Sequence, residues 1–333
     1  MSLTRRPFIK NGALTAAALS AGSLNADAFA ADGAPGAAAS APAEVFYSKE
    51  ISNEKVLALL DKVKSRLTGR VAIKLHSGEP HGPNILPRDL VRAVRASIPD
   101  SQLVECNVLY GSPRRETKTH RETLVVNGYE AGEFDIMDED GDAVIPVAGG
   151  KHLKELNVGK NMLNYDSMLV FTHFKGHAMG GFGGSMKNIA IGCASGKVGK
   201  AQVHGVVKPE DQAKPYTEWP MGEYLMELMA DSAKAICDHF AGRMVFINVM
   251  RRMSVDCDCA GVSAAEPTAP DLGVLASTDI LAIDQASMDL VYALPEAHKK
   301  DLVERFESRK GLHQLAAMEA LGMGSRKYNL VAM

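Results

Sequence analysis

Several features that would place a protein in a particular class are missing from this chain of 333 residues. Lysine and arginine together (37) nearly balance aspartate and glutamate (40), so neither nucleic acid nor an anionic membrane surface is expected as a partner. No run of about 18 or more apolar residues occurs, and no transmembrane segment is predicted. The chain has no internal repeat and no heptad period, which excludes solenoid and coiled-coil architectures.

Cysteine is scarce, with five residues, and no two of them form a C-x-x-C pair. The motif of a ferredoxin-type iron–sulfur cluster is therefore absent, which makes such a cluster doubtful. Because five is an odd number, at least one thiol has no intramolecular disulfide partner. A hydrophobic share of 46% and a charged share of 23% are those of a globular protein, and the chain is long enough to bury a core without disulfides.

Residues 1–30 have the pattern of an export signal. Arg5 and Arg6 form a twin-arginine pair, a stretch of small apolar residues follows, and the Ala-Phe-Ala sequence that ends at Ala30 matches a cleavage site. We therefore expect the twin-arginine export machinery as a partner, cleavage near Ala30 and a periplasmic mature protein. The alternative is an ordinary helical N-terminus with two surface arginines.

The rest of the chain divides into a tether and a folded domain. Residues 31–43 are rich in alanine, glycine and proline, which predicts a flexible linker. Residues 44–333 then form the domain that carries the function. Proteins that load a metal or redox cofactor before export often use the twin-arginine route, so the signal favours a protein with a cofactor.

Helical and strand patterns alternate along the folded domain. Short strand patterns lie at four places: 71–75, 103–106, 168–171 and 244–247, and the one at 168–171 is continuous and apolar. Helical periodicity occurs over seven stretches: 53–67, 87–98, 114–126, 221–240, 280–293, 297–308 and 312–321. This alternation predicts an α/β fold with a mostly parallel sheet and helices on both faces. Asn53 and Asp279 are the expected N-caps, and the polar segment 196–219 is the expected boundary if the chain forms two lobes.

In such a sheet a ligand binds beyond the carboxyl ends of the strands, so the loops that follow strands are the candidates for a site. After the first predicted strand, His76 and His81 could present imidazoles to a ligand or lie as ordinary surface histidines. After the second, Ser112 precedes Arg114, and this turn could hold an anion or simply cap a helix.

The strongest signal is the loop after the strand at 168–171. Four glycines lie within five residues: Gly180, Gly181, Gly183 and Gly184. Such spacing lets backbone N–H groups converge on an anion at the N-terminus of the following helix, although the order matches neither a Walker loop nor a G-x-G-x-x-G fingerprint. Lys175, His177 and Lys187 flank the glycines and are the predicted catalytic residues, acting on an anionic substrate as proton donors or acceptors. His177 could instead bind a metal.

A second unusual motif is Asp256-Cys257-Asp258-Cys259, which follows the strand at 244–247. Both thiols of a C-x-C sequence lie on the same side of an extended chain, and a disulfide that closed this ring would be strained. Metal ligation by one or both thiolates is therefore one interpretation. The other is a turn with buried free thiols.

At these motifs the chain resembles the family called domain of unknown function 362. The resemblance is carried by nine stretches: Ile73 to Glu79, Asn107 to Tyr110, Gly150 to His152, Phe174 to Asn188, Gly192 to Ser195, Gly199-Lys200, His204, Asp256 to Cys259 and Asp271 to Ala286. Many relatives carry a ferredoxin-like insert after the position of His204, where this chain has residues 205–219 without cysteine.

On these motifs we assign two sets of residues beside the catalytic ones. The predicted cofactor-binding residues are Lys74, His76, Gly180, Gly183, Gly184 and Asn188. The predicted metal ligands are His177, His204, Cys257 and Cys259. A transition metal is compatible with the second set, but the sequence names neither the ion nor the cofactor.

Two functions fit these residues. The first is a metal- or cofactor-dependent periplasmic enzyme acting on a small anionic substrate, with redox chemistry favoured by the export route and the thiols. An isomerase or racemase is a variant of it, because a parallel sheet with lysine and histidine loops resembles lactate racemase at the level of the fold. The second is a non-catalytic metal carrier or ligand-binding protein, in which the metal has no open coordination position.

Overall fold

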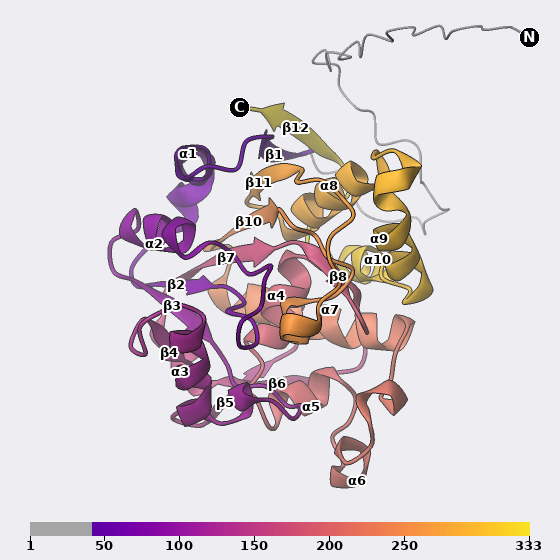
Figure 1. Ribbon diagram of the computed structural model, residues 1–333. Coiled ribbons are helices and arrows are strands. Elements are labelled where there is room, and N and C mark those ends of the chain that lie inside the picture. The colour runs from indigo at the N-terminus through magenta and orange to yellow at the C-terminus, as the bar shows by residue number, and fades with distance from the viewer. Residues whose placement is uncertain (1–41) are drawn as a thin grey trace, which may run out of the picture. The chain divides into compact units, whose positions relative to one another are not determined.

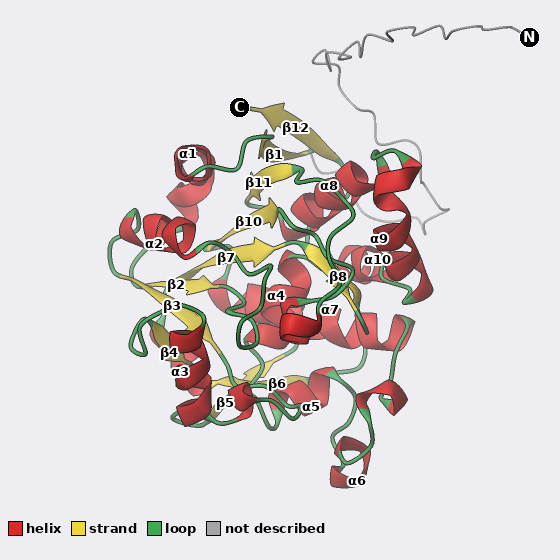
Figure 2. Ribbon diagram, in the orientation of Figure 1, coloured by secondary structure: helices red, strands yellow, loops and turns green. Residues whose placement is uncertain are grey.

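The computed structural model describes residues 42–333, so the predicted signal segment 1–30 lies outside the described residues, as does most of the predicted linker. The last linker residue, Ala43, already begins the first strand. The described residues belong to one compact unit that surrounds a large sheet, drawn in yellow in Figure 2.

Eight strands form this sheet in the order β12-β1-β11-β10-β7-β2-β3-β4. Their bounds are β1 (Ala43–Ser48), β2 (Val71–Lys74), β3 (Ser101–Glu105), β4 (Phe134–Ile136), β7 (Ser167–His173), β10 (Met244–Met250), β11 (Gly273–Ser277) and β12 (Tyr328–Ala332). Of these strands, β11 alone runs antiparallel to its neighbours, so the sheet is mostly parallel, as predicted. Two small hairpins stand outside it: β5 (Asp142–Pro146) with β6 (Glu155–Gly159), and β8 (Lys175–His177) with β9 (Gly181–Gly183).

Helices cover both faces of the sheet. Their bounds are α1 (Asn53–Val63), α2 (Arg88–Ala96), α3 (Thr117–Val126), α4 (Ser185–Gly192), α5 (Gly199–Val203), α6 (Pro209–Gln212), α7 (Glu223–Phe240), α8 (Ile280–Tyr292), α9 (Glu296–Ser308) and α10 (His313–Ala320). Figure 1 shows α1 and α2 together on one side of the strands, and α4, α7 and α8 belong to the other face. The α/β class predicted from the sequence is confirmed.

Two apolar cores, one on each face, hold the layers together. Successive residues of a strand point to opposite faces, so Met168 and Val170 of β7 pack in the core of α4, α7 and α8. Leu169 and Phe171 pack in the core of α1 and α2. A strand that is buried on both faces needs an apolar residue at every position, which explains the uninterrupted run in the sequence.

The helix boundaries follow local capping chemistry. The N-cap of α1 is Ser52 and not Asn53, because the Ser52 hydroxyl accepts the backbone N–H of Lys55 at 3.3 Å. Asp279 caps α8 as predicted and accepts the N–H of Ala282 at 2.8 Å.

The polar segment 196–219 does not divide the described residues into two lobes. It forms α5, α6 and a 3₁₀ turn, η5 (Tyr216–Glu218), and α5 packs against α7 and β6 within the same compact unit. No helix in the described part of the chain is long and apolar enough to cross a membrane.

Candidate functional site

A cavity of about 580 Å³ lies at the carboxyl ends of β2, β3, β7 and β10. This volume is typical of a small-molecule site. The four strands run parallel and end at one edge of the sheet, so the segments that follow them converge there. His76, Tyr110, Lys175 and Cys257 line the cavity, one from each of these segments.

The predicted site residues, which are far apart in the sequence, meet in this cavity. Those that line it are Lys74, His76, Lys175, His177, Gly183, Gly184, Lys187, Asn188, His204, Cys257 and Cys259. Gly180 is the exception and lies buried in the turn between β8 and β9. The glycine motif, the histidine loop and the C-x-C motif therefore belong to one site.

Three potential metal ligands form a cluster on the cavity wall. His177 of β8 and the two thiols beside the 3₁₀ segment η6 (Asp258–Ser263) place one ligand atom each within 4.8 Å of one another. Two sulfurs and one imidazole suit zinc, copper or iron. Among the described residues this cluster does not include His204, whose Nδ1 donates to the carbonyl of Lys200 at 2.7 Å.

The charges around the two thiols favour a thiolate at Cys257. A hydrogen bond from Cys259, together with Lys175, Lys187 and His76, outweighs burial and holds the pKa of Cys257 well below its usual value. The same hydrogen bond raises the pKa of the Cys259 thiol well above its usual value. All the cysteines are free, so both sulfurs are available to a metal.

The ring of His177 is fixed by the backbone of its own turn. Its Nδ1 accepts the N–H groups of Met179 and Gly180 at 3.1 and 2.9 Å, which places the proton of the neutral ring on Nε2. Burial and the charge of Lys187 hold the pKa of His177 well below its usual value. Gly180 therefore orients a candidate ligand, and a metal bound at Nε2 would displace the proton from that nitrogen.

Lys175 is held as an ammonium by a buried ion pair. Its Nζ lies 3.1 Å from Oδ2 of Asp258, and Nδ1 of His173 lies 2.8 Å from the same oxygen. Burial alone would lower the pKa of Lys175, but the Asp258 carboxylate outweighs it and raises that pKa. The ion pair also fixes the C-x-C segment, and the role of Lys175 as a proton donor or acceptor stays a prediction.

The predicted backbone cradle for an anion is already filled by the protein itself. The two oxygens of Asp284 accept the N–H groups of Ser185 and Met186, at 2.8 and 3.0 Å, at the N-terminus of α4. The prediction that this helix end receives a ligand is therefore wrong. A Cβ on Gly184 would lie 2.5 Å from the same carboxylate, so the glycine serves this internal contact.

Lys74 and Asn188 form a buried polar contact at the floor of the site. The Nζ of Lys74 donates to Oδ1 of Asn188 at 3.1 Å and to the carbonyl of Leu75. Burial lowers the pKa of Lys74, although Glu105 lies 4.0 Å away. A Cβ on Gly192 would lie 2.6 Å from the Nζ, so this glycine makes room for the lysine.

Sequence reasoning missed the carboxylate that organises the β3 side of the cavity. Glu105 ends β3 and accepts hydrogen bonds from Ser77 and, at 3.3 Å, from His120. Arg114 lies 3.8 Å from both Glu105 and Glu79. Burial alone would raise the pKa of Glu105, but the charge of Arg114 and the hydrogen bond from His120 outweigh burial and hold that pKa well below its usual value. A charged residue at the end of an apolar strand is the signal that could have revealed it.

The structure places the two loops that follow β2 and β3, for which the sequence left alternatives open. His76 lines the cavity, and its Nδ1 accepts hydrogen bonds from Gly78 and Arg114, both at 3.1 Å. His81 is not among the residues that line it. Ser112 caps a 3₁₀ turn, η3 (Pro113–Arg115), by accepting the N–H of Arg114, and Arg114 itself lines the cavity.

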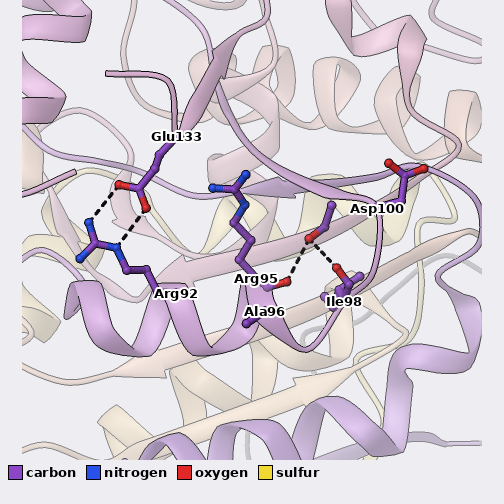
Figure 3. A pocket seen from close by; sticks show the side chains of 7 residues that line it. Arg92, Arg95, Ala96, Ile98, Asp100 and Glu133 are labelled. Carbon is purple, nitrogen blue, oxygen red and sulfur yellow. Dashed lines mark hydrogen bonds and ion pairs between the residues drawn. The ribbon is translucent and has the colours of Figure 1, made fainter. Parts of the chain in front are cut away.

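A smaller hollow of about 350 Å³ lies beside the C-terminal end of α2 (Figure 3). Arg92 there forms an ion pair with Glu133 at 3.0 Å, and Arg95 donates to Gln102 at 3.0 Å. No histidine or cysteine of the described residues lines it, and its arginines already have partners. Apart from Gly180, all the predicted site residues line the larger cavity, and none of them lines this hollow.

Three comparisons relate the chain to known proteins. The family model described as Domain of unknown function (DUF362) matches residues 71–289, a range that contains every residue lining the cavity. No curated protein matches the sequence significantly.

Two solved structures are similar at a distance. The lactate racemase apoprotein from Thermoanaerobacterium thermosaccharolyticum has 14% identity and a TM-score of 0.39, over 74% of this chain and 56% of that chain. A protein from Thermotoga maritima has 12% identity and a TM-score of 0.35, over 61% of this chain and 51% of that chain. The chain thus spans little more than half the length of either protein, and likenesses of this level carry no conclusion about activity.

Proposed function

This chain belongs to the DUF362 family, and from that premise we propose that it is a metal-dependent enzyme that acts on a small anionic substrate. One observation carries the proposal. The cluster of His177, Cys257 and Cys259 shares its cavity with Lys187, whose ammonium has no carboxylate partner among the described residues. A candidate metal centre and a free cation thus face the same small-molecule space.

The donor set determines what a metal could contribute. His177, Cys257 and Cys259 would hold the ion, and three protein ligands leave one position of a tetrahedral ion for substrate or water. A thiolate-bound metal supplies Lewis-acid or redox chemistry. We favour redox chemistry, because thiolates suit metals that change oxidation state and because the predicted export route suits a cofactor loaded before secretion.

The other residues of the cavity bind and orient. The half-buried ammonium of Lys187 attracts an anionic group more strongly than it would at an open surface, because solvent screens it less. The ion pair of Lys175 with Asp258 holds the segment between the two thiols in place. Glu105 and Arg114, which pair at 3.8 Å, also line the cavity.

We further propose that the mature protein works in the periplasm. This part of the proposal rests on the twin-arginine pair Arg5-Arg6 and the cleavage pattern near Ala30, which lie outside the described residues. A metal carrier or ligand-binding protein is the alternative function. The cavity of about 580 Å³ beside the candidate metal ligands favours an enzyme over a metal carrier, because a carrier with a closed coordination sphere needs no space for a substrate.

Titration of the purified metal-free chain with Co²⁺ tests the metal centre. We expect about one ion per chain and an absorption band from thiolate-to-cobalt charge transfer. The double variant Cys257→Ser, Cys259→Ser should lose both the ion and the band, because the hydroxyls do not replace thiolates. Cys237→Ser is the matched control, since that half-buried thiol lies on α7 outside the cluster. An unchanged band in the double variant would remove the thiols from the proposal.

A further inference from the structure

The lysines of the cavity fall into two groups by their counter-ions. Lys175 lies 3.1 Å from the carboxylate of Asp258, and Lys74 lies 4.0 Å from that of Glu105. Lys187 and Lys200 also line the cavity, yet neither has a carboxylate oxygen within 4.0 Å in the described part of the chain. Two ammonium groups of the site therefore have no carboxylate counter-ion among the described residues, although the charge of Lys187 also favours the thiolate of Cys257.

Lys200 is buried, so the lack of a carboxylate counter-ion is energetically unfavourable for it. Lys200 is only 4% exposed, and its Nζ donates a hydrogen bond to the carbonyl of Ala194 at 2.7 Å. A buried ammonium without a counter-ion is strongly unfavourable, because burial removes the water that would otherwise solvate the charge. An anion bound in the cavity would supply what the fold lacks.

Lys187 and Lys200 act on the same part of the cavity, next to His204. Burial and the charges of both lysines lower the pKa of His204 to about 4. The hydrogen bond from the imidazole to the Lys200 carbonyl acts in the opposite direction. Trp219 packs edge-on against the imidazole with ring centres 5.4 Å apart, and Tyr216 lies nearby in the same lining. Both lysines, His204 and these two aromatic residues line the same cavity.

The carboxylates of the cavity are not available to these lysines. Asp256 lies 3.1 Å from Arg305, and Glu105 is surrounded by Arg114 and His120. Either carboxylate would have to give up its present partner to neutralise Lys187 or Lys200. The counter-ion is therefore to be sought in a ligand.

We propose that Lys187 and Lys200 together bind one ligand that carries two negative charges, such as a phosphate monoester or a dicarboxylate, beside His204. The inference rests on the proposed function and names the substrate class of the same cavity. Two ammonium groups form charge-assisted hydrogen bonds with a dianion, whereas a monoanion would leave one buried charge uncompensated. Tyr216 and Trp219 would contact the uncharged part of the ligand.

Calorimetric titration of the metal-free protein at low ionic strength tests this inference with three probes: inorganic phosphate, malonate and acetate. We expect phosphate or malonate to bind at least about tenfold more tightly than acetate. Lys187→Gln and Lys200→Gln should each weaken dianion binding about tenfold or more. Lys197→Gln is the matched control, because this exposed lysine pairs with Glu116 at 3.6 Å and should change nothing.

The results distinguish a phosphate ester from a dicarboxylate, and they distinguish a failure of the dianion site from a failure of the metal centre. Preference for phosphate assigns a phosphate ester, and preference for malonate assigns a dicarboxylate. The inference is overturned if acetate binds as tightly as the dianions, if no dianion binds, or if neither lysine variant weakens dianion binding. Co²⁺ binding should persist in Lys200→Gln, because Lys200 is not among the charges that favour the Cys257 thiolate. A failure of the dianion test in this variant therefore stays distinct from a failure of the metal centre. Thermal unfolding checks each variant, and the half-buried, unpaired Lys187 keeps the test valid if Lys200→Gln does not fold.

Discussion

The lysines and arginine of the cavity differ in whether a carboxylate of the chain neutralises them, and this difference separates residues that stabilise the fold from residues that are available to a ligand. Lys175 and Arg114 are buried against the carboxylates of Asp258 and Glu105. Lys187 and Lys200 have no such partners among the described residues. The first group is electrostatically complete without a ligand and the second is not. Stability should therefore depend on the first group, and ligand binding on the second.

The largest expected effect comes from breaking a complete pair. Asp258→Asn leaves the charge of Lys175 buried without its carboxylate and removes the carboxylate that contacts Nδ1 of His173, so it should cost about 3–5 kcal/mol of unfolding free energy. Urea denaturation measures this loss. Lys187→Gln is the matched comparison and should change stability by less than about 0.5 kcal/mol, because no intramolecular partner is lost. Equal losses in the two variants would erase the distinction between the groups.

A smaller expected effect is a dependence of stability on pH, caused by His204 beside the lysines that lack a carboxylate partner. The pKa of His204 is about 4 in the folded chain, lowered by burial and by Lys187 and Lys200, against about 6.5 in an unfolded chain. Between these values the unfolded state binds the proton and the folded state does not. Stability should therefore fall as the pH drops from about 6.5 to about 4.

The Lys187→Gln variant isolates the electrostatic part of this effect. Removing one neighbouring charge should raise the pKa of His204 and flatten the loss of stability over the same pH interval. Titration of the imidazole signals by NMR in the metal-free protein measures the change. An identical His204 pKa in the two proteins would show that Lys187 does not act on this part of the cavity.

The elements that sequence predicted best are those with a strong periodic signal. The strands β2, β3, β7 and β10 each contain a short apolar stretch, and the order of strands and helices around them predicts the parallel sheet. The edge strand β12 and the hairpin strand β5 were missed, because their residues are partly exposed and do not form such runs. β11 was missed because its sequence, Gly273–Ser277, consists mostly of small residues.

For the site, sequence revealed the reactive residues but not their partners. Histidines, lysines and a C-x-C motif after predicted strands were enough to place His177 and Cys257 at one edge of the sheet. Their environment depends on contacts that no local pattern contains: Asp258 reaches His173 across 85 positions, and Asp284 reaches Ser185 across 99. Asp258 pairs with Lys175, a predicted proton donor or acceptor, and Asp284 occupies the helix end that was predicted to receive a ligand.

The most direct test of the central claim is elemental analysis, together with an absorption spectrum, of the mature protein recovered after export from a native-like host. The account predicts about one transition metal per chain, absent from the Cys257→Ser, Cys259→Ser variant prepared in the same way. A wild-type protein that carries no metal, or a variant that keeps the same metal content, would contradict it.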